Sequence, residues 1–172
     1  MRPGKPLLFT LVAAAGFLLH PQAEVKAQFY LGAHGSVGEI NRTAWGLGAR
    51  LGAVVHQSSD LTLALEGVGE YFWPSCDQVD CGVVAFAGNL LARQRVASYA
   101  EVYGGVGVIY EHYTIENDLA RRNGDDIGFS ILVGTQSGTP GGTRPFLEVR
   151  YSWMGELENQ AAVALGFRVP IG

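Results

Sequence analysis

From residue 28 to residue 172, apolar and polar side chains alternate in short segments, and this period of two constrains the fold more than any other feature. In a β-strand, successive side chains point to opposite faces, so a period of two is the pattern of a strand with two different environments. No helical period of useful length competes with it after residue 28. The chain is therefore predicted to be all-β.

Eight such segments follow one another, and each is rich in the aromatic and β-branched residues that strands favour. They are residues 29–37, 45–55, 61–73, 83–93, 100–110, 127–136, 147–153 and 162–169. Every second connection is short, at 56–60, 94–98 and 137–143, whereas those at 38–44, 74–82, 111–126 and 154–160 are on average longer. Short turns on one side and longer loops on the other predict an eight-stranded antiparallel up-and-down transmembrane β-barrel.

The first 27 residues have the parts of a secretory signal peptide. Arg2 and Lys5 precede an apolar stretch at residues 7–19, and Val25 and Ala27 occupy the −3 and −1 positions of a cleavage site. The apolar stretch is shorter than the roughly 20 residues that a transmembrane helix needs. We predict a cleaved signal peptide at 1–27 and a barrel domain at 28–172; an uncleaved anchor is the alternative.

Charge and cysteine content exclude several classes of function. From residue 28 onward there are 15 acidic residues and 9 arginines, so the basic patch of a nucleic-acid-binding protein is missing. The two cysteines, Cys76 and Cys81, lie in one polar loop, which in an exported protein predicts a disulfide. A metal site with Asp77 and Asp80 is the alternative, but two thiols without histidine make a poor zinc site. We predict no metal and no cofactor.

The two phases of the alternation differ in content. One phase is almost free of charge and carries aromatic residues near the segment ends, which are predicted to form an aromatic girdle at the membrane surface: Trp45, Tyr71, Trp73, Tyr110, Tyr151 and Trp153. The other phase is rich in small residues and holds four acids and four arginines, predicted as a lumen charge network: Arg50, Glu66, Glu70, Arg93, Glu101, Glu148, Arg150 and Arg168. A soluble lipocalin-like barrel, with the phases reversed around a lipid ligand, remains as an alternative.

Glycine-rich segments such as Tyr-Gly-Gly-Val-Gly-Val at 103–108 and the closing Ala-Leu-Gly-Phe-Arg-Val at 164–169 complete this pattern. With the export signal and the eight strands, the chain resembles the small outer-membrane β-barrel proteins, of the OmpA, OmpX and OmpW barrel type. The resemblance implies a bacterial outer-membrane location, contact with outer-membrane lipid and with the barrel-assembly machinery, and a monomer. It implies a role in membrane integrity or surface interaction.

Some barrels of this size deacylate lipid A with a His-x-Ser pair, in which a carboxylate orients the histidine and the histidine activates the serine. His34 and Ser36 have this spacing, and a strand places both on one face. Their phase is the lumenal one, away from lipid. We therefore predict no catalytic residue, with a deacylase that uses His34 and Ser36 as the alternative.

Overall fold

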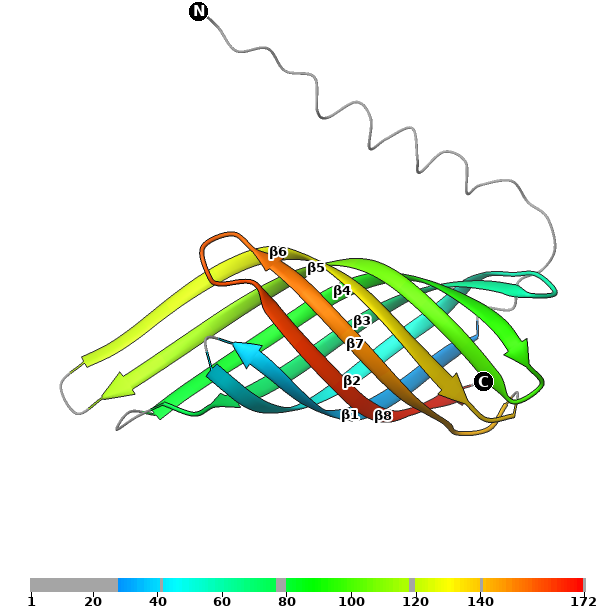
Figure 1. Cartoon of the computed structure of the whole chain (residues 1–172), viewed down its shortest axis with the longest axis horizontal. Helices are drawn as coiled ribbons and strands as arrows, with labels where there is room; N and C mark the ends of the chain where they lie inside the picture. The colour runs from blue at the N-terminus through cyan, green and yellow to red at the C-terminus, as the bar shows by residue number, and fades with distance from the viewer. Residues whose placement is uncertain (1–27, 41, 77–79, 118–119, 140, 172) are drawn as a thin grey trace, which may run out of the picture.

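Eight antiparallel strands close into a barrel in the computed structural model of the chain (Figure 1). The structure describes residues 28–171 except 41, 77–79, 118–119 and 140. Its strands are β1 (Phe29–Ile40), β2 (Arg42–Gln57), β3 (Leu61–Pro74), β4 (Asp80–Ala97), β5 (Ala100–Asn117), β6 (Ala120–Ser137), β7 (Arg144–Met154) and β8 (Gln160–Ile171). The predicted fold class is confirmed. The predicted signal peptide lies outside the described residues and stays a prediction.

Each strand pairs with its neighbour in sequence, and β1 pairs with β8 to close the barrel. Phe29 lies opposite Ile171 and Val37 lies opposite Val163 along this seam. Closure pairs each strand with two neighbours along the barrel wall, which is the condition for a sheet to exist in a lipid environment. Among the residues described, no helix is long and apolar enough to span a membrane.

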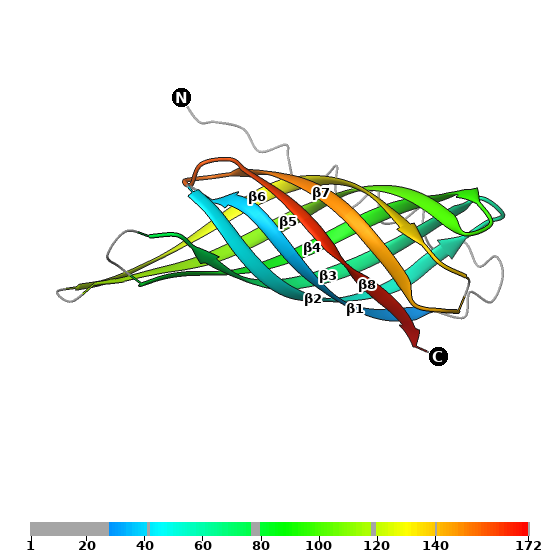
Figure 2. The ribbon, with the colours of Figure 1, turned by 60° about the horizontal axis from the view of Figure 1, so that its bottom comes forward.

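The two ends of the barrel differ, and Figure 2 shows both. One end carries the start of β1, the end of β8 and the turns that follow β2, β4 and β6; we call it the terminal end. The other carries the connections that follow β1, β3, β5 and β7; we call it the loop end. In the turn after β6, Gly138 and Gly141 have φ angles of 128° and 81°, a conformation that favours glycine.

The segment predicted as the longest loop, residues 111–126, is instead mostly strand. β5 and β6 remain paired up to Asn117 and Ala120, so they form a hairpin that projects beyond the rest of the loop end (Figure 1). Its charged residues suggested a loop, but Tyr113, Thr114 and Ile115 are strand formers and continue the ladder. The predicted connection at 94–98 is likewise shortened, because β4 continues to Ala97.

The apolar phase of the alternation faces outward on all eight strands. The exposed side chains include Leu47 on β2, Phe86 on β4, Ile127 on β6 and Leu165 on β8. The opposite phase is buried in the lumen, which is the reverse of a lipocalin-like barrel, where the apolar residues surround a ligand. The apolar phase is therefore the outer face of the barrel and the charged phase its inner face, as predicted for a transmembrane barrel.

Small residues on β2 make room for large side chains from β1 and β3. A Cβ on Gly48 would lie 2.4 Å from the His34 ring and 2.7 Å from Glu70, and one on Gly46 would lie 2.6 Å from the ring of Phe72. Because real side chains do not approach this closely, these inward positions have to be glycine. Eight strands enclose a lumen that is only wide enough for side chains to fill. Here the glycines of β2 leave space for the large side chains of β1 and β3.

Candidate functional site

A ring of four charged residues crosses the middle of the lumen. Arg50 lies 3.2 Å from Glu66 and 3.1 Å from Glu148, and Arg168 lies 3.0 Å from Glu66 and 3.4 Å from Glu148. Each arginine therefore contacts both carboxylates, and each carboxylate contacts both arginines. All four side chains are almost fully buried, so this alternation of charge is what makes their burial tolerable.

Phe146, on β7, contacts both guanidinium groups of this ring. The Arg50 and Arg168 guanidinium carbons lie 4.2 Å and 4.3 Å from the ring centroid of Phe146. Arg168 also lies 4.8 Å from the centroid of Tyr103, whose hydroxyl donates a hydrogen bond to Glu148 at 3.0 Å. Cation–π contacts of this kind contribute about 0.5–2 kcal/mol each, more where water is excluded.

A second cluster joins the ring on the side of the loop end. Glu70 accepts a hydrogen bond from Arg150, and its other oxygen lies 2.8 Å from Nε2 of His34. Arg50 donates its Nε–H to Nδ1 of His34 at 3.4 Å. Because Nδ1 accepts, the proton of the imidazole lies on Nε2 and is donated to Glu70. Three arginines and three glutamates therefore balance within the ring and this second cluster.

Two of the eight predicted network residues, Arg93 and Glu101, lie apart from the rest at the terminal end. Arg93 donates to the Tyr30 hydroxyl, and within the described chain no carboxylate lies at salt-bridge distance from it. Glu101 contacts Arg144 at 3.3 Å and Arg95 at 4.0 Å. Sequence reasoning missed these two arginines because they flank turns. The signal was the alternation itself, since Arg95 is two residues from Arg93 and Arg144 is four residues from Glu148, so both continue the lumenal phase.

An apolar cluster fills the lumen on the loop-end side of the charges, and sequence reasoning missed it. Its core is formed by inward side chains of β2 to β5, with Tyr113 and Met154 packed against them: Ala44, Val68, Phe72, Val83, Ala85, Ala87 and Ile109. Burying an aliphatic or aromatic side chain contributes about 1.5–3 kcal/mol. The cluster and the charged ring lie next to each other inside the barrel, since Val68 of the cluster is paired with Arg50 of the ring.

The six aromatic residues predicted as a girdle all point outward in the half of the barrel nearer the loop end. Trp45 and Trp73 are cross-strand neighbours. Edge-to-face contacts join Tyr71 to Trp73, with centroids 4.7 Å apart, and Tyr151 to Trp153, at 4.9 Å. Tyr110 donates its hydroxyl to Asp125 at 2.7 Å.

Beyond these aromatic residues the loop end is acidic. By their position in the strands and connections, the acidic residues there include Glu39, Asp80, Glu111, Glu116, Asp125, Asp126, Glu156 and Glu158, against arginines at 42, 121 and 122. Hydrogen bonds from Tyr110 and His112 hold the pKa of the Asp125 carboxyl below its usual range. Burial would raise the pKa of Asp126, but the backbone N–H groups of Leu157, Glu156 and Ile127 outweigh it and lower that pKa.

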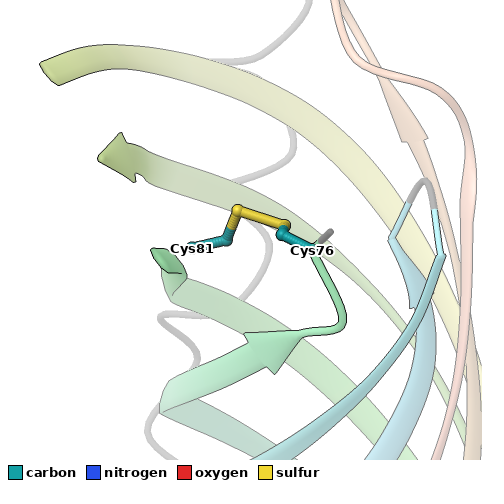
Figure 3. The surroundings of a disulfide bond; sticks show 2 residues. All are labelled: Cys76 and Cys81. Atoms are coloured by element: carbon teal, nitrogen blue, oxygen red, sulfur yellow. A yellow bond between two sulfur atoms is a disulfide. The ribbon is translucent and has the colours of Figure 1, made fainter. Parts of the chain in front are cut away.

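Cys76 and Cys81 form a disulfide between the end of β3 and the start of β4 (Figure 3). Their Cα atoms are 6.2 Å apart, within the usual range for a disulfide. The bond closes a short segment at the loop end, far along the barrel from the charged ring. With both sulfurs in the disulfide, the thiolates that the alternative metal site needs are not available.

His34 and Ser36 are both buried in the lumen. Both nitrogens of His34 contact Glu70 or Arg50, and the hydroxyl of Ser36 has no hydrogen-bond partner among the described residues. A nucleophile needs its base within hydrogen-bond reach and a path to its substrate. The geometry gives Ser36 neither a base nor contact with the lipid-facing surface.

Solved structures with a similar architecture include bacterial surface and outer-membrane proteins. Neisserial surface protein A has 14% sequence identity and a TM-score of 0.61, covering 83% of this chain and 96% of its own. Ail, the attachment invasion locus protein of Yersinia pestis, has 10% identity and a TM-score of 0.62, covering 84% and 97%.

The fold is that of a small outer-membrane β-barrel. The outer membrane enzyme PagL shares it at 14% identity and a TM-score of 0.53, covering 81% of this chain and 99% of its own. Neither a protein-family model nor a curated protein sequence matches the chain. At these identities the likeness establishes the fold of the barrel, and activity has to be argued from its residues.

Proposed function

We propose that this protein resides in the bacterial outer membrane as a monomeric, non-enzymatic barrel with a closed lumen, and acts in membrane integrity or surface interaction. The observation that carries the proposal is the distribution of side chains: an apolar exterior on every strand around a lumen filled by charge pairs and an apolar cluster. An apolar exterior of this extent is stable only against lipid. Outer-membrane lipid and, during biogenesis, the barrel-assembly machinery are the partners that such an exterior requires.

Fractionation of cells that express the full chain tests the location. We expect the protein in the outer-membrane fraction, with different mobilities on gels for boiled and unboiled samples, because folded small barrels resist detergent. A protein that stays in the soluble periplasmic fraction without this shift would refute the proposal.

Conductance in a planar lipid bilayer tests the closed lumen. The wild-type protein should show no sustained open-channel current, because Phe72, Ile109 and the Arg50–Glu66 pair obstruct the pore. Phe72→Gly with Ile109→Gly removes much of the apolar cluster and is the positive comparison. A stable current through the wild-type protein would show that the lumen opens.

The deacylase alternative has its own test. Overexpression should leave the acylation of lipid A unchanged, since Ser36 is buried and its hydroxyl has no hydrogen-bond partner among the described residues. Deacylated lipid A that disappears with Ser36→Ala would reverse this conclusion.

A further inference from the structure

A cavity of about 200 Å³ opens in the barrel at the terminal end. Tyr30, Arg93, Glu101, Arg144 and Arg168 line it, together with Arg95. Outward-facing Phe29 and Ile171, at the seam of β1 and β8, lie on its margin. The cavity is therefore in contact both with the aqueous mouth of the barrel and with the surface that faces lipid.

Arg93 is buried in this cavity, and among the described residues no carboxylate lies at salt-bridge distance from it. Only 5% of the residue is exposed, and its guanidinium lies 4.5 Å from the centroid of the Tyr30 ring and donates to the Tyr30 hydroxyl. Its Nε–H has no hydrogen-bond partner in the part of the chain that the structure describes. Leaving a buried guanidinium without an anion is unfavourable by several kcal/mol, roughly the cost of one broken buried ion pair.

The two carboxylates that interact electrostatically with Arg93, Glu66 and Glu101, are already paired with other arginines. Arg168 is engaged by Glu66 and Glu148 in the ring, and it donates to Gln136 at 3.1 Å. Glu101 is the one carboxylate among the residues that line the cavity. It is shared by Arg144 and Arg95 and accepts a hydrogen bond from Gln136 at 2.6 Å.

Arg168 also lines the cavity, but its charge is balanced within the ring. The remaining charges at the mouth are those of Arg93, Arg95 and Arg144 against Glu101. Asp60, in the adjacent turn, does not line the cavity. A concave site with an excess of two positive charges attracts an anion.

We infer that this cavity is a binding site for a phosphate group, held by Arg93, Arg144 and Arg95. Guanidinium groups bind phosphate oxygens in pairs, through parallel N–H donors in fixed geometry. A bound phosphate would satisfy the free Nε–H of Arg93 and restore neutrality at the mouth. The phosphate can belong to a lipid headgroup that reaches in past Phe29 and Ile171, or to a free ion, and the two sources are separable by experiment.

The test uses the full folded protein in a phosphate-free amine-oxide detergent, with ³¹P NMR line width and calorimetry as readouts. Inorganic phosphate is titrated in one arm, and short-chain phosphatidylglycerol in the other, with short-chain phosphatidylcholine as the zwitterionic comparison. Saturable binding in the first arm identifies a free phosphate ligand. Saturable binding of phosphatidylglycerol alone identifies a lipid headgroup, and either result supports the site.

Arg93→Gln should weaken binding at least tenfold, and Arg144→Gln several-fold, whereas Arg93→Lys should retain part of it. Arg122→Gln removes the same charge from the opposite end of the barrel, where residue 122 pairs with Ile115, and should leave binding unchanged. The gel-mobility shift checks that each variant is folded. If Arg93→Gln does not fold, Arg95→Gln with Arg144→Gln tests the site through more exposed side chains. No saturable binding in either arm, or equal loss with Arg122→Gln, would overturn the inference.

Discussion

Glu66 holds the charged ring together, and Glu66→Gln is the sharpest test of that ring. Glu66 accepts hydrogen bonds from Arg50 at 3.2 Å and from Arg168 at 3.0 Å and 3.3 Å. Glutamine keeps the shape of the side chain and one oxygen acceptor but removes the negative charge. The ring then holds two arginines against one carboxylate, all of them buried.

The expected loss follows from these contacts. Breaking a buried ion pair by removal of one partner destabilises a protein by about 3–5 kcal/mol, a large part of the roughly 5–15 kcal/mol that stabilises a typical fold. Glu101→Gln is the matched control, because Glu101 has the same charge but is partly exposed at the mouth. Pairs that water reaches are screened and contribute less than fully buried ones, so this control should lose less than Glu66→Gln.

Urea unfolding in lipid vesicles, followed by tryptophan fluorescence, measures both variants, because Trp45, Trp73 and Trp153 face outward and report insertion. A second variant, Glu66→Gln with Arg168→Gln, restores the charge balance and should recover part of the loss, since directly contacting residues show non-additive effects of about 0.5–3 kcal/mol. If Glu66→Gln unfolds within about 1 kcal/mol of the wild type, or no more easily than Glu101→Gln, the ring does not stabilise the barrel as argued.

Three further predictions concern packing, the disulfide and pH. Gly134→Ala should destabilise the barrel in the same urea assay by about 1–3 kcal/mol, because the new Cβ would lie 2.4 Å from the Tyr103 ring, whereas Gly88→Ala, with no atom within 4 Å, should be neutral; equal effects would contradict the packing argument. Cys76→Ser with Cys81→Ser should lower the unfolding free energy by no more than about 2 kcal/mol, since the closed segment is short, with the gel-mobility shift retained; a variant that no longer folds would show a larger role. The pKa of Asp126 is lower in the folded protein than in the unfolded chain, where it is near 4. The ionised carboxylate therefore stabilises the fold above that pH, and this stabilisation is lost as the pH falls through the pKa of the folded protein. Amide exchange at Glu156 and Leu157, whose N–H groups Asp126 binds, should therefore accelerate on acidification relative to amides in mid-strand, and Asp126→Asn should abolish this pH dependence; unchanged relative protection across this range would refute it.

The architecture is predictable from the sequence because the alternation within each strand is enough to decide which side chains face inward and which face outward. Every inward arginine and glutamate of the predicted network is on the alternation, and the outward phase of each strand is apolar. The hairpin of β5 and β6 was missed because its charged residues are typical of a loop, whereas pairing with the neighbouring strand decides whether a segment continues as strand.

Contacts within the lumen are less predictable, because they depend on the register between strands distant in sequence. Arg168 and Glu66 are 102 residues apart, and nothing local to either indicates that they meet. Phe72 fits inside because Gly46 lies directly opposite on β2, a pairing that follows from register alone. The pairing of Glu101 with Arg144 instead of Arg93 has the same origin.

The contrast between the acidic loop end and the arginine-rich terminal end gives the barrel an electric dipole moment along its axis. In a bilayer whose leaflets differ in charge, the two possible orientations of the molecule therefore differ in electrostatic energy. The charge of the lipids alone favours the orientation in which the arginine-rich terminal end contacts the more anionic leaflet. Insertion in the opposite sense requires cations that neutralise the loop end, or an assembly step that fixes orientation before the field of the lipids acts.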